Sequence, residues 1–77
     1  MPRNFSSRIH YDKQTVLAVI LPYYKADGLY YEINISGLPR FHMTWSPLGR
    51  FDITEHMPGI PDSLILAISD VLEKEKK

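Results

Sequence analysis

The chain has 77 residues, of which 44% are hydrophobic, and its nine basic residues balance nine acidic ones. This composition is typical of one small folded domain and argues against a disordered tail. The zero net charge removes the simplest argument for nucleic-acid binding. Because the chain contains no cysteine, disulfides and thiolate metal sites are excluded, which fits a reducing compartment such as the cytoplasm.

A membrane partner is not expected from this sequence. No apolar run approaches the roughly 20 residues that a membrane-spanning helix needs. Residues 1–13 are polar and show no signal-peptide pattern. We therefore expect a cytoplasmic protein.

Residues 1–14 allow two interpretations. Phe5, Ser7, Ile9 and Tyr11 alternate weakly with polar neighbours, which favours a short edge strand. A loose N-terminal arm is the alternative, because chain termini stay mobile unless packing holds them. Residues 15–77 are then predicted to form a single α+β domain.

Residues 15–21 form a continuous apolar run that ends before Pro22, and their β-branched content favours a strand. The run is apolar on both faces. One face would carry Val16, Ala18 and Ile20, and the other would carry Leu17, Val19 and Leu21. Only one of these sets can face a shared core, so the other is expected to form an exposed apolar patch.

Three amphipathic strands are predicted after an Asp27-Gly28 turn, at residues 29–36, 41–45 and 50–54. Apolar and polar side chains alternate in each, which is typical of a sheet with one solvated face. The predicted apolar face consists of Tyr31, Ile33, Ile35, Phe41, Met43, Trp45, Phe51 and Ile53.

The connections between these strands predict their registers. Pairing Ser36 with Arg40 would set Ile35 against Phe41, Ile33 against Met43, and Tyr31 against Trp45. A three-residue loop over residues 47–49 would set Trp45 against Phe51 and Met43 against Ile53. Pro47 suits the first position of that loop, and Gly49 suits the left-handed conformation at its end.

A C-terminal helix is predicted to begin at Pro61, with an apolar stripe formed by Leu64, Ile65, Ile68, Val71 and Leu72. The stripe should dock on the apolar face of the sheet and bury Trp45 between the two layers. The predicted fold is a two-layer α+β domain, in which a four-stranded antiparallel meander carries the helix on one face.

The polar face of the sheet offers one candidate site for chemistry. The predicted registers place Asn34, His42 and Thr54 in one row, with Glu32, Thr44 and Asp52 in the row beside it. A histidine near two carboxylates could act in general acid–base catalysis or hold a metal weakly. The simpler interpretation is that this face is polar because it faces water.

No motif for a cofactor is present. The sequence has no glycine-rich phosphate loop and no nucleophile elbow, and His10 and His56 match no zinc-ligand spacing. We therefore expect neither a cofactor nor a metal, and an enzyme is the least favoured class of function.

Aromatic and basic residues suggest a second kind of site. Tyrosines interspersed with cations can stack the bases of single-stranded nucleic acid. The residues concerned are Tyr23, Tyr24, Lys25, Tyr30 and Arg50. Tyrosine is also an ordinary strand and interface residue, so this function ranks second.

The favoured hypothesis is a non-enzymatic interaction or regulatory protein that acts as a homodimer and also binds another protein. The expected homodimer interface consists of Val16, Ala18 and Ile20 on the strand, or of the alternate set Leu17, Val19 and Leu21. The outer side of the helix, with Leu66, would then remain as an interface for a different partner. If the N-terminal arm covers the strand instead, Phe5, Ile9 and Tyr11 would form the cover.

Overall fold

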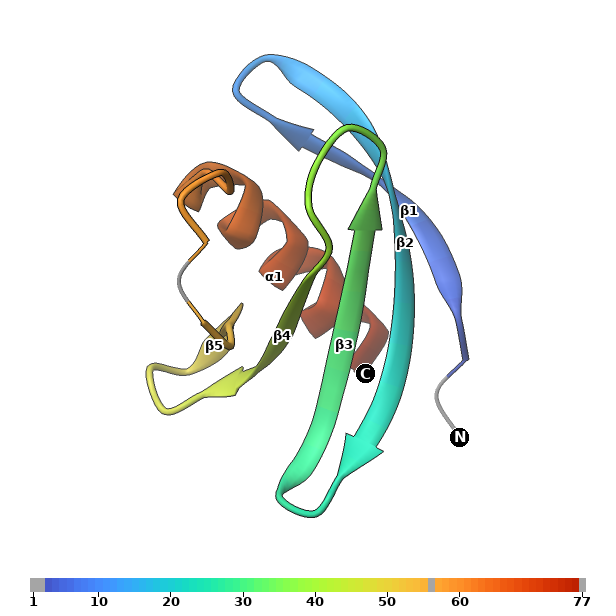
Figure 1. Ribbon diagram of the computed structural model, residues 1–77, viewed down its shortest axis with the longest axis vertical. Helices are drawn as coiled ribbons and strands as arrows, with labels where there is room; N and C mark the ends of the chain where they lie inside the picture. Colours follow the sequence, from blue (N-terminus) through green and yellow to red (C-terminus); the bar gives the residue numbers. More distant parts are fainter. Residues whose placement is uncertain (1–2, 56, 77) are drawn as a thin grey trace.

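The computed structural model describes residues 3–55 and 57–76, which form five antiparallel strands and one helix. The elements are β1 (Phe5–Tyr11), β2 (Gln14–Lys25), β3 (Gly28–Ile35), β4 (Phe41–Ser46), β5 (Arg50–Ile53) and α1 (Asp62–Lys76). The strands follow one another in a single curled sheet of order β1-β2-β3-β4-β5 (Figure 1). This arrangement confirms the predicted α+β fold with a C-terminal helix on an antiparallel meander.

The N-terminal residues form an edge strand. β1 pairs with β2 over its whole length, from Phe5 opposite Ile20 to Tyr11 opposite Gln14. The two-residue turn between them places Asp12 at φ 47° and Lys13 at φ 62°, the conformation that such tight hairpins require. Asp12 Oδ2 also accepts a hydrogen bond of 2.8 Å from the Ser63 hydroxyl, which ties this turn to the start of α1.

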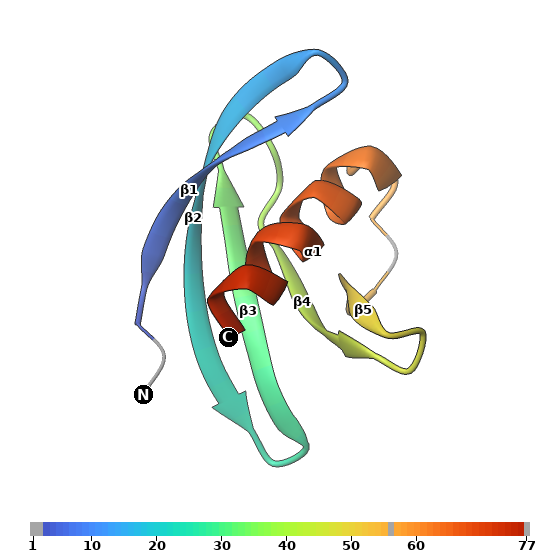
Figure 2. The same ribbon diagram turned by 180° about the vertical axis from the view of Figure 1, so that it is seen from behind.

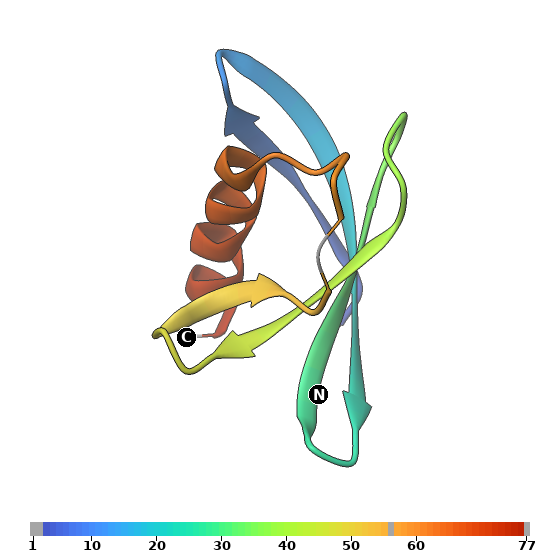
Figure 3. The ribbon, with the colours of Figure 1, turned by 60° about the vertical axis from the view of Figure 1, so that its left-hand side comes forward.

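Helix α1 lies on the concave side of the sheet and packs against both edge strands, β1 and β5 (Figures 2 and 3). Its buried side chains match the predicted stripe, since Leu64, Ile68 and Leu72 have no exposed surface. We call the helix side of the sheet the inner face and the opposite side the outer face. The inner-face core includes Ile9, Ala18, Ile20, Tyr31, Ile33, Ile35, Phe41, Met43 and Phe51.

The free edge of β5 is satisfied by side chains. The Phe51 N–H donates a hydrogen bond of 3.0 Å to Ser69 Oγ on the helix, and the Ile53 N–H donates one of 2.8 Å to Asp52 Oδ1. Unpaired N–H groups on an edge strand are sites for unwanted pairing with other chains. These two bonds, with the helix beside them, make β5 a poor site for adding another strand.

The predicted turn between β4 and β5 is confirmed. Trp45 pairs with Phe51 and Met43 pairs with Ile53, and the Gly49 N–H donates a hydrogen bond of 3.0 Å to the Ser46 carbonyl. Gly49 has φ +84°, the left-handed conformation expected from the sequence.

Replacing Gly49 with valine should lower the free energy of unfolding by more than about 1 kcal/mol, because a β-branched residue is strained at positive φ. A Cβ at this position would meet no atom within 4 Å, so the cost is conformational rather than a clash. Gly59→Val is the matched control, since that position is equally open and lies outside the left-handed region. Urea unfolding of both variants checks the prediction, and equal stability would contradict it.

The predicted register between β3 and β4 is wrong by two residues. Tyr31 lies opposite Met43, and Ile33 lies opposite Phe41. The chain turns immediately after β3, where the Leu38 N–H donates to the Ile35 carbonyl at 3.1 Å. Gly37 adopts φ +86° in this turn, and residues 39–40 then precede β4. A slip of two preserves which face each side chain occupies, so the inner and outer sets remain as predicted.

The register difference changes the environment of Trp45, which was expected to be buried between sheet and helix. Its side chain is 44% exposed, although its ring packs edge-on against Phe51 with 5.0 Å between ring centroids. The slip moves Trp45 towards the end of the sheet, where the β2–β3 hairpin extends beyond the C-terminal end of the helix (Figure 1).

Candidate functional site

The expected interface on β2 requires correction. Ala18 and Ile20 have no exposed surface and belong to the inner-face core, while Val16 packs at its edge. The hydrophobic residues of β1 and α1 bury this side of β2. The alternate set therefore faces outward, with Leu17 at 56% and Val19 at 41% exposure.

These outward side chains form an apolar patch on the outer face. Leu17 and Val19 border a hollow of about 400 Å³. The hollow is also lined by Leu38 from the β3–β4 connection, which packs partly against the core, and by the buried Ile35. We call Leu17, Val19 and Leu38 the β2 patch. The helix lies on the other side of the sheet (Figure 3), so no described element covers the patch.

A polar cluster centred on Glu32 lies beside the patch. Asn34 donates a hydrogen bond of 3.0 Å to Glu32 Oε2, while Arg40 and His42 place nitrogens 3.8 and 3.7 Å from Oε1. The Asn34 hydrogen bond, with help from the nearby Arg40 guanidinium and His42 ring, lowers the pKa of the Glu32 carboxyl. The ionised Glu32 carboxylate therefore contributes to the stability of the fold above the ordinary glutamate pKa. This contribution is lost as the pH falls through the lowered pKa of Glu32.

The predicted polar rows are rearranged by the register of β3 and β4. Glu32 lies directly opposite His42, and Thr44 lies between Tyr30 and Asp52. Asn34 is therefore one row away from His42. Glu32, Asn34, His42, Thr44 and Asp52 all remain on the outer face, as the alternation predicts.

The side chains of the polar face are poorly placed for general acid–base catalysis. Glu32 and His42 are adjacent, but Asp52 lies in the next row and is engaged with Arg50 at 3.6 Å. Among residues 3–55 and 57–76, no three histidine, aspartate or glutamate side chains are grouped to hold a metal ion.

The aromatic set splits between the two faces. Tyr23 and Tyr30 stack on the outer face with 5.7 Å between ring centroids, and Lys25 Nζ lies 4.8 Å from the Tyr30 ring centre. The His42 ring meets Tyr23 edge-on at 5.8 Å. Tyr24 points to the opposite side of the same hairpin. The structure thus brings Tyr23, Lys25 and Tyr30 together and separates Tyr24 from them.

The tyrosines of this row already contact other side chains of the protein. The Tyr30 hydroxyl donates a hydrogen bond of 2.7 Å to Asp27, which raises the pKa of Tyr30 and lowers that of Asp27. Lys25 and Tyr23 both contact the Tyr30 ring, and Tyr30 and His42 both contact the Tyr23 ring. These contacts compete with a base for the surface of the rings.

A second exposed aromatic surface was missed from the sequence. Tyr24 and Trp45 are both exposed on the inner side of the sheet, where the strands extend beyond the helix. Leu29 lies between them, opposite Tyr24 in the ladder and bonded through its carbonyl to the Thr44 hydroxyl at 2.9 Å. The feature that could have indicated this surface is the length of β2 and β3. Because these two strands are longer than helix α1, part of the inner face remains uncovered.

Leu66, the remaining predicted interface residue, is exposed on the helix and lies outside the β2 patch. It borders a separate cavity beside β5. The helix surface with Leu66 is therefore separate from the β2 patch.

Comparisons of this chain with protein-family models, curated proteins and solved structures find no match. In the described part of the chain, the one helix is neither long nor apolar enough to cross a membrane.

Proposed function

We propose that this protein is a non-enzymatic interaction protein that forms a homodimer through the β2 patch. The observation that carries the proposal is the exposure of Leu17 and Val19 in the middle of the longest strand. Soluble proteins seldom leave contiguous apolar surface bare, and a twofold contact between identical copies is the commonest way to bury it.

The charged side chains beside the patch are Arg8 and Arg40. Arg8 lies opposite Leu17 on β1, and Arg40 lines the hollow and lies 3.8 Å from Glu32. A twofold axis along β2 would set the patch against itself and keep the two Arg8 side chains on opposite sides of the contact. The zero net charge of the chain adds no general repulsion.

The size of the contact indicates a weak dimer. The outer face is convex, because the sheet curls around the helix (Figure 3). We take a contact that is three strands wide, over β1, β2 and β3, and about eight residues long. With strands about 4.8 Å apart and a rise of about 3.4 Å per residue, its area is about 400 Å² per copy. This is about half of the 800 Å² per partner that a standard stable interface buries. We therefore expect dissociation in the micromolar range.

Sedimentation equilibrium over a range of micromolar concentrations tests the dimer. The intact chain should show a reversible monomer–dimer equilibrium. Leu17→Lys and Val19→Lys, made separately, should be folded monomers, because each would place like charges in an apolar contact. Leu48→Lys is the matched control, since Leu48 is an exposed leucine in the turn between β4 and β5 and should leave the dimer intact.

Two results would overturn the proposal. One is an intact chain that stays monomeric at the highest concentration. The other is a dimer that survives both β2 substitutions, which would place the interface elsewhere. The exposed Tyr24 and Trp45 are then the first alternative, because tyrosine and tryptophan are enriched at interface hot spots.

Binding of single-stranded nucleic acid is the second candidate function. The observation that favours it is the row formed by Lys25, Tyr30 and Tyr23 on an open sheet face. It ranks lower because the neighbours in this row already lie against the rings. Salt-dependent retention of the protein on a single-stranded oligonucleotide would reverse the ranking. A cytoplasmic location and a further protein partner belong to the first proposal, and the cysteine-free composition supports a reducing environment.

A further inference from the structure

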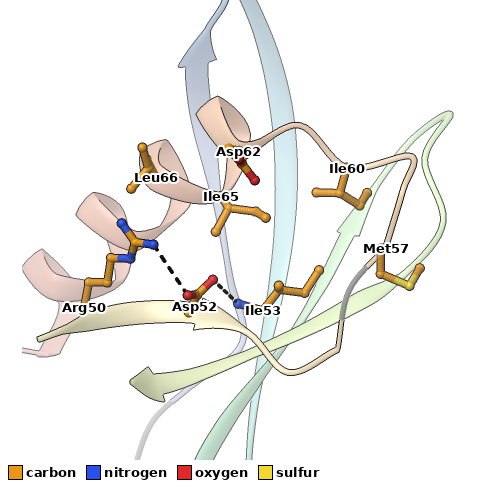
Figure 4. A pocket seen from close by; sticks show the side chains of 8 residues that line it. All are labelled: Arg50, Asp52, Ile53, Met57, Ile60, Asp62, Ile65 and Leu66. Atoms are coloured by element: carbon orange, nitrogen blue, oxygen red, sulfur yellow. Dashed lines mark hydrogen bonds and ion pairs between the residues drawn. The ribbon is translucent and has the colours of Figure 1, made fainter. Parts of the chain in front are cut away.

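Strand β5 and the first turns of α1 border a cavity of about 340 Å³ beside the sheet edge (Figure 4). Its volume is at the lower end of the range for small-ligand sites, about 300–1,000 Å³. Its walls come from β5, from the helix and from the connection between them. The cavity is therefore formed by segments that meet only in the folded chain.

The apolar part of the cavity is aliphatic. Ile60 and Ile65 are 6% and 7% exposed and form its nearly buried floor, while Leu66 is 45% exposed at its side. None of the described residues that line the cavity is aromatic. Such a surface binds a saturated carbon chain through the hydrophobic effect, and it lacks the rings that an aromatic cage uses for quaternary ammonium groups.

The polar part of the cavity carries one positive and two negative side chains, Arg50, Asp52 and Asp62. The Arg50 Nη2 atom lies 3.6 Å from Asp52 Oδ2, and Asp52 Oδ1 accepts the Ile53 N–H. Asp62 is an exposed carboxylate in the first turn of the helix, where the partial positive charge of the helix N-terminus offsets part of its negative charge. Arg50 thus compensates Asp52, and part of the negative charge of Asp62 remains available to a ligand.

We propose that this cavity binds an alkylammonium group, in which a primary amine is carried on an aliphatic stem. The stem would lie on Ile60, Ile65 and Leu66, and the ammonium would pair with Asp62. A carboxylate or phosphate would be repelled by Asp62, and a purely apolar ligand would give the Asp62 carboxylate no partner. Either a free small amine or a lysine side chain of a partner supplies this chemistry.

Titration of the ¹⁵N-labelled chain by amide NMR with n-hexylammonium tests the proposal. The amides of Ile53, Ile65 and Leu66 should shift in a saturable manner. The neutral analogue 1-hexanol should bind more weakly at the same amides, and hexanoate should cause no shift there. Equal binding of all three compounds, or no shift with hexylammonium, would overturn the assignment.

Asp62→Asn separates the charge from the cavity. It should weaken hexylammonium binding by about two- to fivefold, which is the size of a partly exposed ion pair, and leave hexanol binding unchanged. The matched control is Asp70→Asn, an exposed aspartate on the same helix that does not line this cavity. Equal effects of the two substitutions would show a general surface charge effect and overturn the site.

A third titration distinguishes the two sources of the amine. N-acetyl-lysine-N-methylamide presents the same ammonium on a peptide-like backbone. Tighter binding of this compound than of hexylammonium supports a partner lysine, and weaker binding supports a free amine. Because the cavity shares no residue with the β2 patch, these results are independent of whether the protein dimerises.

Discussion

Ile20→Lys should unfold this domain. Ile20 has no exposed surface and lies between Phe5 on β1 and Ile33 on β3. A lysine there would bury an unpaired charge among apolar side chains at a cost of several kcal/mol. A domain of this size has a total stability of about 4–12 kcal/mol, so the loss consumes most or all of it. Far-UV circular dichroism and urea unfolding measure the effect.

Val19→Lys is the control for this prediction, because Val19 is the next residue along β2 and points to the outer face. Its substitution should change the free energy of unfolding by no more than about 1 kcal/mol. A folded Ile20→Lys protein together with an unfolded Val19→Lys protein would show that the two faces of β2 are assigned the wrong way round. The same folded Val19→Lys variant is the one that the dimerisation experiment needs.

This pair of variants tests which face of β2 is buried, a choice that the sequence pattern leaves open. Residues 15–21 are apolar on both faces, so their alternation predicts a strand without predicting which side is buried. The choice depends on contacts that are distant in the sequence. Ile9 from β1 and the helix residues Leu64 and Ile68 all pack on the side of Ala18 and Ile20. The site prediction failed at Ala18 and Ile20 for this reason.

The two strand connections show which local signals fix a register. Between β4 and β5, a proline and a glycine in a three-residue loop specify one turn, and face parity agrees with it. Between β3 and β4, face parity was the main guide, and a slip of two residues satisfies parity equally well. The chain turns at Gly37 within a shorter turn than the expected three-residue connection over residues 37–39. As a result, Arg40 lies next to Glu32 and not opposite Ser36.

The parts of the candidate surfaces that depend on neighbouring residues in the sequence could be predicted, and the parts that depend on contacts between separate elements could not. Membership of the outer face follows from alternation alone, so Glu32, His42 and Asp52 were placed correctly on it. Which of these side chains lie next to one another depends on the register between β3 and β4, which the sequence did not determine. The cavity beside β5 could not be predicted, because it depends on how closely Leu66 and Asp62 approach a strand that lies earlier in the chain.

Ser69→Ala is the second prediction of large effect. Ser69 is 3% exposed, and its hydroxyl accepts the Phe51 N–H at the free edge of β5. The sequence contains a signal for this residue, since Ser69 lies four residues after Ile65 and three before Leu72, within the apolar stripe of the helix. Alanine would leave a buried backbone donor unsatisfied, which costs about 1–3 kcal/mol.

The matched control is Ser63→Ala, because the Ser63 hydroxyl also makes one hydrogen bond, to Asp12, but does so at the surface. Its loss should cost about 0.5 kcal/mol or less. Urea unfolding compares the two variants, and amide hydrogen exchange reports the Phe51 N–H directly. In Ser69→Ala, exchange at Phe51 should accelerate by more than the global loss of stability explains, since the β5 edge would open locally. If Phe51 exchange follows global unfolding alone and the two variants are equally stable, the Ser69 hydroxyl does not protect this edge.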